Sequence, residues 1–257
     1  TGLKSVLASS FCFIPIFIGF ILPIIELSLW ALETNVDIFN NKFLVGSFNT
    51  ITLGLFTGLI CALLAIVINF SIRFTKNKFL ERLNSLMSIG YAIPGLILAV
   101  GITRFLVFSD QNVFTNINFV ITGSLVGLFL AYIIKSYALA NSSIESGYER
   151  ISNSIDNSAQ LLGSSGGKLL GRIHFPLMRT SFLTAVLLVT SEVVKELPAT
   201  LILRPFNFDT LAVITYTYAA EERMYQAALP SLAIVIIGII PIIFLTKMIR
   251  SSRIKDS

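Results

Sequence analysis

Charged residues are scarce in this sequence: Asp, Glu, Lys and Arg make up 13% of its 257 residues, whereas hydrophobic residues make up 54%. A soluble globular domain has about 25% charged residues, and its surface helices carry a polar face. Stretches such as "FCFIPIFIGFILPII", residues 11–25, have no polar face at helical spacing. These absences argue against a soluble protein and indicate a protein that spans a membrane.

Cysteine and histidine are also scarce, with two cysteines and one histidine in the whole chain. Cys12 and Cys61 both lie in apolar runs, where a cysteine is usually a small packing residue. We therefore expect neither a disulfide nor a metal pair, and we assign no metal site.

Long apolar runs are what the sequence has instead. Each meets the roughly 20-residue length that a helix needs to cross about 30 Å of hydrocarbon. They predict an all-α, polytopic membrane protein with six transmembrane helices in one domain. The runs lie near residues 6–32, 47–72, 83–108, 117–140, 181–203 and 226–249.

Lysine and arginine indicate the orientation, because they resist translocation and collect in cytoplasmic loops. On one side only Lys42, Arg204 and Arg223 occur in loops, with Arg104 near the end of a run. We therefore expect the cell inner (plasma) membrane, both termini cytoplasmic, and no nucleic-acid partner for the net charge of +5. The other side has Lys4, Arg73, Lys76, Lys78, Arg82, Arg150, Lys168, Arg172, Arg179, Lys247, Arg250, Arg253 and Lys255.

The glycine-rich stretch "LLGSSGGKLLGRIHFP", residues 161–176, invites comparison with a phosphate-binding loop. Such a loop has the form G-x-x-x-x-G-K-[ST]. Relative to Lys168, the opening glycine is replaced by Leu162 and the hydroxyl residue by Leu169. We therefore expect this chain to bind no nucleotide or other cofactor and to be no enzyme.

This stretch belongs to the longest polar loop, residues 141–180, whose pattern predicts order. Ser154 is a plausible N-cap, Asp156 lies in the first helical turn, and Gly163 lies where a left-handed C-terminal residue belongs. Ile155, Ala159 and Leu162 lie at helical spacing on one face. We expect a short helix, a glycine corner and a second helix ending near Pro176, with a solvated linker as the alternative.

The loop resembles the signature of permease subunits of ATP-binding-cassette (ABC) importers, E-A-A-x-x-x-G followed after nine residues by I-x-L-P. Phe175 replaces the leucine, Asn157 the glutamate and Ser158 an alanine, with Asp156 next to the lost glutamate. The resemblance implies a type I ABC importer permease fold whose loop forms coupling helices that dock on a cytoplasmic ATPase. His174, at a variable position, is expected to be a surface or loop histidine. The matching positions are Asn157, Ser158, Ala159, Gly163, Ile173 and Pro176.

Two further segments, "SIGYAIPGLILAVG" and "KELPATLILRP", look like the ferric-iron importer permeases, and the similarity runs from about residue 6 to 249. It implies iron(III) as cargo, a periplasmic binding protein, an ABC ATPase dimer that uses ATP and Mg, and a second permease half, fused or separate. This chain resembles the carboxyl half. Thiamine, sulfate and polyamine remain alternative cargoes.

The corresponding division of the chain has three parts. Residues 1–40 form the first transmembrane helix and the start of an external loop, in contact with membrane lipid. Residues 41–250 form the permease domain, with its coupling loop at 141–180, and residues 251–257 form a cytoplasmic tail.

Charges inside the fifth run are costly unless they face protein, water or a partner. Glu192 and Glu196 are one turn apart on one helix face, with Lys195 close enough to neutralise either, and Pro198 breaks the helix. An internal salt bridge and a translocation-pathway role are equally favoured. Gly90 and Pro94 similarly interrupt the third run and are pathway candidates.

Two functions of other classes remain open. In a proton- or ion-coupled secondary transporter, Glu192 and Glu196 would carry protons without an ATPase. A membrane scaffold protein would transport nothing. Neither explains the docking signature.

Overall fold

The computed structural model describes residues 2–33, 40–113 and 120–255, and all regular secondary structure in these ranges is helical. A π-helical turn (Phe17–Ile21) joins α1 to α2, a 3-10 turn (Gly90–Ala92) follows α4, and a second π-helical turn (Leu170–His174) joins α8 to α9. The α-helices are α1 (Leu3–Ile16), α2 (Leu22–Glu33), α3 (Asn41–Thr75), α4 (Lys78–Ile89), α5 (Gly95–Asn112), α6 (Leu125–Glu149), α7 (Asn153–Leu161), α8 (Gly166–Leu169), α9 (Phe175–Val194), α10 (Pro198–Leu203), α11 (Leu211–Ala220) and α12 (Met224–Lys255).

Side-chain caps account for where the longest central helices begin. The Asn40 side chain accepts a hydrogen bond from the Lys42 N–H at the start of α3. Ser124 does the same for the Val126 N–H at the start of α6. Each cap satisfies a backbone donor that the first helical turn leaves without a partner.

The apolar runs fold as membrane-length helices. The described residues contain five unbroken helices long and apolar enough to cross a membrane. The number is six if the bent pair of Lys78–Ala92 and Gly95–Asn112 is counted as one span. The predicted class of all-α, polytopic membrane protein is therefore confirmed. The five unbroken segments are Ala8–Glu33, Asn41–Thr75, Leu125–Glu149, Gly166–Val194 and Met224–Phe244.

The third span, expected at 83–108 with an interruption, consists of α4 and α5. Its two helices meet at an angle of 117°. Pro94, which has no N–H, is the N-cap of α5, and a Cβ on Gly90 would collide with the backbone of Ile134 on α6. The chain therefore turns at the interruption that the sequence predicted at Gly90 and Pro94.

The long polar loop expected at 141–180 is mostly helix, and two span boundaries shift as a result. α6 extends to Glu149, so the fourth span is not the expected 117–140. The fifth span is Gly166–Val194 and not 181–203. The second loop helix does not end near Pro176 but continues through it, because a π-helical turn precedes the proline and already makes the hydrogen-bond ladder irregular.

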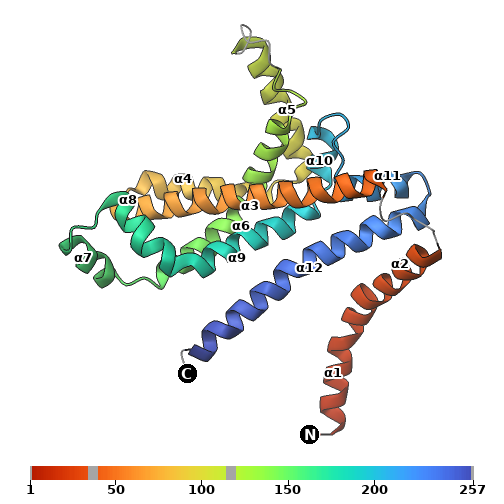
Figure 1. The fold of residues 1–257 in the computed structure, drawn as a ribbon, viewed down its shortest axis with the longest axis horizontal. Coiled ribbons are helices and arrows are strands. Elements are labelled where there is room, and N and C mark those ends of the chain that lie inside the picture. Colours follow the sequence, from red (N-terminus) through yellow and green to blue (C-terminus); the bar gives the residue numbers. More distant parts are fainter. Residues whose placement is uncertain (1, 34–39, 114–119, 256–257) are drawn as a thin grey trace.

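The centre of the molecule is a bundle of α3, α6 and α9, which lie side by side (Figure 1). Small residues let these helices approach closely, as is usual in membranes. A Cβ on Gly58 would lie 2.7 Å from the Val186 carbonyl oxygen, and Cys61 and Ala62 are fully buried. The predicted packing role of Cys61 is confirmed, whereas Cys12 on α1 is exposed.

The remaining helices lie around this bundle. Figure 1 shows α7 and α8 at one end of α3 and α11 at the other, while α5 and α10 project to one side. α1 and α2 run apart from the bundle; none of the Ala8–Glu33 window is buried, and α2 packs against α12. Large apolar side chains of both helices, among them Phe11 and Leu32, are exposed.

We predict that Gly58→Val destabilises the bundle of α3, α6 and α9 by about 1–3 kcal/mol, the usual cost of overpacking a well-packed core. Its Cβ would push against the backbone of α9. The measurement is the melting temperature in detergent, followed by size-exclusion chromatography after heating. Gly101→Val is the matched control, because a Cβ on Gly101 of α5 meets nothing within 4 Å. Equal melting temperatures for the two variants would contradict the packing.

Candidate functional site

A break in the fifth span places a carboxylate inside the helical bundle. α9 ends at Val194, α10 begins at Pro198, and Glu196 between them is 6% exposed. The Glu196 Oε1 accepts a hydrogen bond from the Ala199 N–H at 3.3 Å. A carboxylate at this position caps the helix and interacts favourably with its dipole. Glu196 thus stabilises the start of α10.

Lys135 of α6 neutralises this carboxylate, since its ammonium forms an ion pair with the Glu196 Oε2. Gly95, the first residue of α5, packs against the pair: a Cβ there would lie 2.5 Å from the Glu196 Oε1 and 3.4 Å from the Lys135 Nζ. Any larger residue at position 95 would displace one of the two charges. The breaks in the third and fifth spans therefore meet at one ion pair.

Two hydroxyl groups complete this cluster. Thr200 donates to the Glu196 carbonyl oxygen at 2.7 Å, and the Tyr132 hydroxyl lies 2.6 Å from the Thr200 Oγ1. Both side chains are almost completely buried. We call Glu196, Lys135, Thr200 and Tyr132 the Glu196 cluster. Because buried charges are costly unless paired and hydrogen-bonded, this network fixes how the third, fourth and fifth spans fit together.

The predicted placement of Glu192 and Glu196 on one helix face is wrong. α9 ends at Val194, so Glu196 does not continue its helical face. The expected pairing of Lys195 with one of the two carboxylates is confirmed, because Lys195 pairs with Glu192 at 2.9 Å; the Lys195 side chain is 64% exposed. The two carboxylates therefore have different partners and different environments.

Sequence reasoning missed Lys135, the partner of Glu196. The signal was present, because Lys135 is the only charged residue in the apolar run 117–140. A single charged residue in the middle of a membrane span indicates a partner of opposite charge on another span. Of the other predicted pathway residues, Gly90 is buried against α6, next to Lys135, and Pro94 and Pro198 lie at the two breaks.

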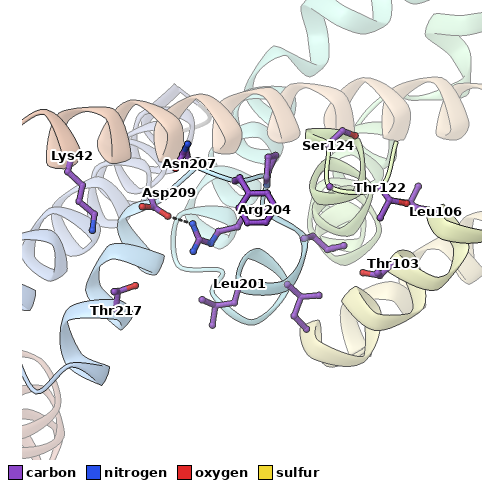
Figure 2. Close-up of a pocket in the computed structure, with 16 residues that line it drawn as sticks. Lys42, Thr103, Leu106, Thr122, Ser124, Leu201, Arg204, Asn207, Asp209 and Thr217 are labelled. Atoms are coloured by element: carbon purple, nitrogen blue, oxygen red, sulfur yellow. Dashed lines mark hydrogen bonds and ion pairs between the residues drawn. The ribbon is translucent and has the colours of Figure 1, made fainter. Parts of the chain in front are cut away.

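A polar cavity of about 590 Å³ lies towards the amino-terminal end of α3, where Lys42 lines it. In Figure 2 the Arg204 guanidinium points at Asp209, with which it forms an ion pair. Asn207 between them has a left-handed backbone, with φ of 59°. Hydroxyl groups and apolar side chains line the rest of the wall, so the cavity offers both charged and neutral hydrogen-bond donors. These hydroxyl residues are Thr103, Thr122, Ser124 and Thr217.

The opposite end of α3 contacts the corner that the sequence predicted for docking. We call residues 153–165 the coupling corner. Gly163 has φ of 81°, its N–H donates to the Gln160 carbonyl at 2.9 Å, and the Ser164 N–H donates to the Ala159 carbonyl at 2.9 Å. This pair of bonds is a Schellman motif, which ends α7. The left-handed turn predicted at Gly163 is confirmed.

Exposure divides the predicted docking residues into two groups. Asn157 and Ser158 are exposed, as is Pro176 beyond the corner, while Ala159 is buried and Ile173 half-buried. The most prominent side chains are two that sequence reasoning did not single out as docking residues: Leu161 is 89% exposed and Leu162 86%. The coupling corner therefore has an apolar tip.

Two expectations for this segment are corrected. Ser152, not Ser154, is the N-cap of α7. His174 is not at the surface, because it is fully buried beside Asp156.

The sequence resembles transport-system permeases at low identity. No family model matches the sequence. The chain is 26% identical over 237 residues to the Fe(3+)-transport system permease protein FbpB 2 of Haemophilus influenzae, covering 88% of this chain and 44% of that protein. It is also 26% identical over 190 residues to the putative 2-aminoethylphosphonate transport system permease protein PhnV of Salmonella typhimurium, covering 74% of this chain and 68% of that one.

Solved structures show the same fold. A bacterial ABC transporter involved in the import of the acidic polysaccharide alginate superposes with a TM-score of 0.68 at 16% identity, covering 98% of this chain and 94% of that one. The chain has the fold of an ABC importer permease. The inward-facing MetNI methionine ABC transporter also superposes on this chain, with a TM-score of 0.59 at 13% identity over 79% of this chain and 94% of that one. The chain spans less than half the length of its iron-transport relative.

We predict that Lys135→Met destabilises the protein by about 3–5 kcal/mol, because it leaves the Glu196 carboxylate buried without a counter-charge. Glu196→Gln should be damaging for the converse reason, and the double variant should recover part of the loss. The measurement is a double-mutant cycle on detergent melting temperatures. Additive losses would contradict the direct pairing of the two residues. Glu192→Gln, at the more exposed pair, is the control.

Proposed function

We propose that this permease is a transport subunit of an ABC importer, with iron(III) as its cargo. A periplasmic binding protein delivers the cargo and a separate ATPase hydrolyses ATP. Similarity to the Fe(3+)-transport permease supports the cargo. The observation that carries the proposal is the coupling corner, whose exposed Leu161 and Leu162 lie at one end of α3 on an otherwise polar segment. Exposed apolar side chains rimmed by polar ones suit the groove of a partner protein.

The mechanism is alternating access driven from the corner. Gly166–Val194 is one continuous helical segment of 29 residues, which corresponds to about 44 Å. It begins next to the coupling corner and ends two residues before Glu196. A push by the ATPase on the corner therefore reaches the Glu196 cluster, where the breaks in the third and fifth spans let neighbouring helices tilt.

The assembly in this proposal is larger than the chain. A second permease half, fused or separate, completes the pathway, and an ATPase dimer docks on the two coupling corners. The excess of lysine and arginine in the loops on one side supports a cytoplasmic position for both termini at the inner membrane, on the same side as the corner. The exposed apolar surface of α1 and α2 faces lipid or the second half.

We predict that the double substitution Leu161→Glu, Leu162→Glu removes ATPase binding while the permease still inserts and folds. Both side chains are almost fully exposed, so the change affects the partner contact and not the core. The measurement is copurification of the ATPase subunit with tagged permease and its second half, together with the melting temperature of the permease.

Phe79→Glu is the matched control. Phe79 is 68% exposed on α4, on the same proposed side of the membrane but outside the coupling corner. Retention of the ATPase by the double leucine variant would contradict docking through the corner. Absence of the ATPase from the unsubstituted complex would overturn the ABC importer itself and favour an ion-coupled transporter or a scaffold.

A phosphonate-bearing solute is the second candidate cargo. The similarity to a putative 2-aminoethylphosphonate permease supports it, as does the cavity, where Lys42 and Arg204 supply cationic groups and Asp209 an anionic one. Such a lining suits a small molecule that carries a phosphonate and an amine.

We predict uptake of radioactive iron(III), and none of 2-aminoethylphosphonate, by cells that express the complete importer. The comparison includes Lys42→Gln, with the exposed Lys247→Gln as control. Phosphonate uptake that falls in the Lys42 variant and not in the control would replace iron by the second candidate. Uptake of neither compound would leave other small cargoes, among them thiamine, sulfate and polyamine, to be assayed in the same cells.

A further inference from the structure

Asp156, in the first turn of α7, joins three elements through one buried carboxylate. It is 5% exposed. Its Oδ2 accepts a hydrogen bond from the Arg73 Nε of α3 at 2.7 Å, and its Oδ1 lies 2.8 Å from the His174 Nε2. His174 ends the π-helical turn that leads into α9. We call Asp156, Arg73 and His174 the Asp156 cluster.

The Arg73 guanidinium binds a fourth element with its remaining N–H groups. Nη1 donates to the Tyr148 carbonyl at 3.0 Å and Nη2 to the Ile151 carbonyl at 2.6 Å, at the end of α6 and in the connection to α7. A further contact joins Nη2 to the Asn153 Oδ1 at 3.3 Å. Carbonyl groups at a helix end have no partner within the helix, so Arg73 satisfies these while it holds Asp156.

His174 is packed as tightly as any residue of the bundle, with no exposed surface. The rings of Phe70, Phe74 and Tyr148 surround it, with centroids 5.5 to 5.9 Å from its own. A carboxylate oxygen only accepts hydrogen bonds, so the facing Nε2 is the donor. The imidazole thus connects Asp156 to the helix that continues as the fifth span.

We propose that Asp156, Arg73 and His174 are positioning residues that transmit the movement of α7 to α3, α6 and α9; this rests on the proposed function. α7 has nine residues, and a helix this short is marginal on its own. It is joined to its neighbours by residues 150–152 and by the turn at Gly163. Without the buried cluster, a push on its exposed face would rotate α7 and leave the spans in place.

The two faces of α7 therefore have separate tasks. Asn157, Ser158 and Leu161 point away from the bundle and are free to contact the ATPase, while Asp156 and Ala159 are buried against it. Asp156 does not compensate for the missing acidic docking residue at position 157. Removing it uncouples transport from hydrolysis and leaves docking intact.

The test uses the complete importer reconstituted in liposomes, with ATPase copurification, ATP hydrolysis and uptake measured on the same preparation. In Asp156→Asn we expect normal copurification and hydrolysis within about twofold, with uptake per ATP hydrolysed reduced about tenfold, a typical size for coupling between two sites. Glu149→Gln is the matched control, because Glu149 is an exposed carboxylate at the end of α6.

Substitutions of His174 separate transmission from simple stability. Gln keeps an N–H that can reach Asp156, whereas Phe keeps the packing among the rings and loses the donor. We expect His174→Gln to retain most of the coupling and His174→Phe to lose it. Uptake and ATP hydrolysis are measured in the same liposomes. A variant that only folds in lower yield therefore has the same ratio of uptake to ATP hydrolysed as the unsubstituted importer.

Three results would overturn the proposal. One is an unchanged coupling ratio in Asp156→Asn, and another is equal behaviour of the two His174 variants. The third is loss of the ATPase from Asp156→Asn, which would make Asp156 a docking residue. ATPase binding by the unsubstituted importer is measured before the variants. Its absence would contradict the proposed function and not the role of the Asp156 cluster.

Discussion

The ion pair between Glu196 and Lys135 is the interaction on which the arrangement of the spans depends. A broken helix inside a membrane leaves backbone groups that neither lipid nor water satisfies. Here the Glu196 carboxylate caps the second half of the break, Lys135 on α6 neutralises it, and Gly95 leaves room for both. Two broken spans can share the bundle because they meet at this pair.

A second buried carboxylate, Asp156, lies near the other end of the same long helix. The Gly166–Val194 helix begins next to the Asp156 cluster and ends next to the Glu196 cluster, and it packs along α3 and α6 between them. Packed helices move as units and do not deform continuously. In this account the corner receives the movement, the helix carries it, and the paired breaks convert it into a change of access to the pathway.

Patterns that depend on neighbouring residues were predictable from the sequence. The apolar runs predicted the membrane class through composition. Gly90 and Pro94 predicted the interruption of the third span, and Gly163 predicted the left-handed turn, because these residues act on the local backbone conformation. Contacts between distant segments were not predictable. Lys195 was expected to neutralise either Glu192 or Glu196, whereas the partner of Glu196, Lys135, lies 61 residues earlier on another span. The burial of His174 was missed for the same reason, since α3 and α6 supply the rings around it.

The central claim is that movement of the coupling corner reaches the break beside Glu196, and a spin label beside that break tests it most directly. Lys195 is 64% exposed and can carry a nitroxide as Lys195→Cys, with Cys12 replaced by serine and the fully buried Cys61 left in place. The account predicts that adding ATP to the complete importer changes the spectrum of this label, and that Asp156→Asn abolishes the change while the ATPase stays bound. An identical spectrum with and without ATP in the importer that retains Asp156 would contradict it.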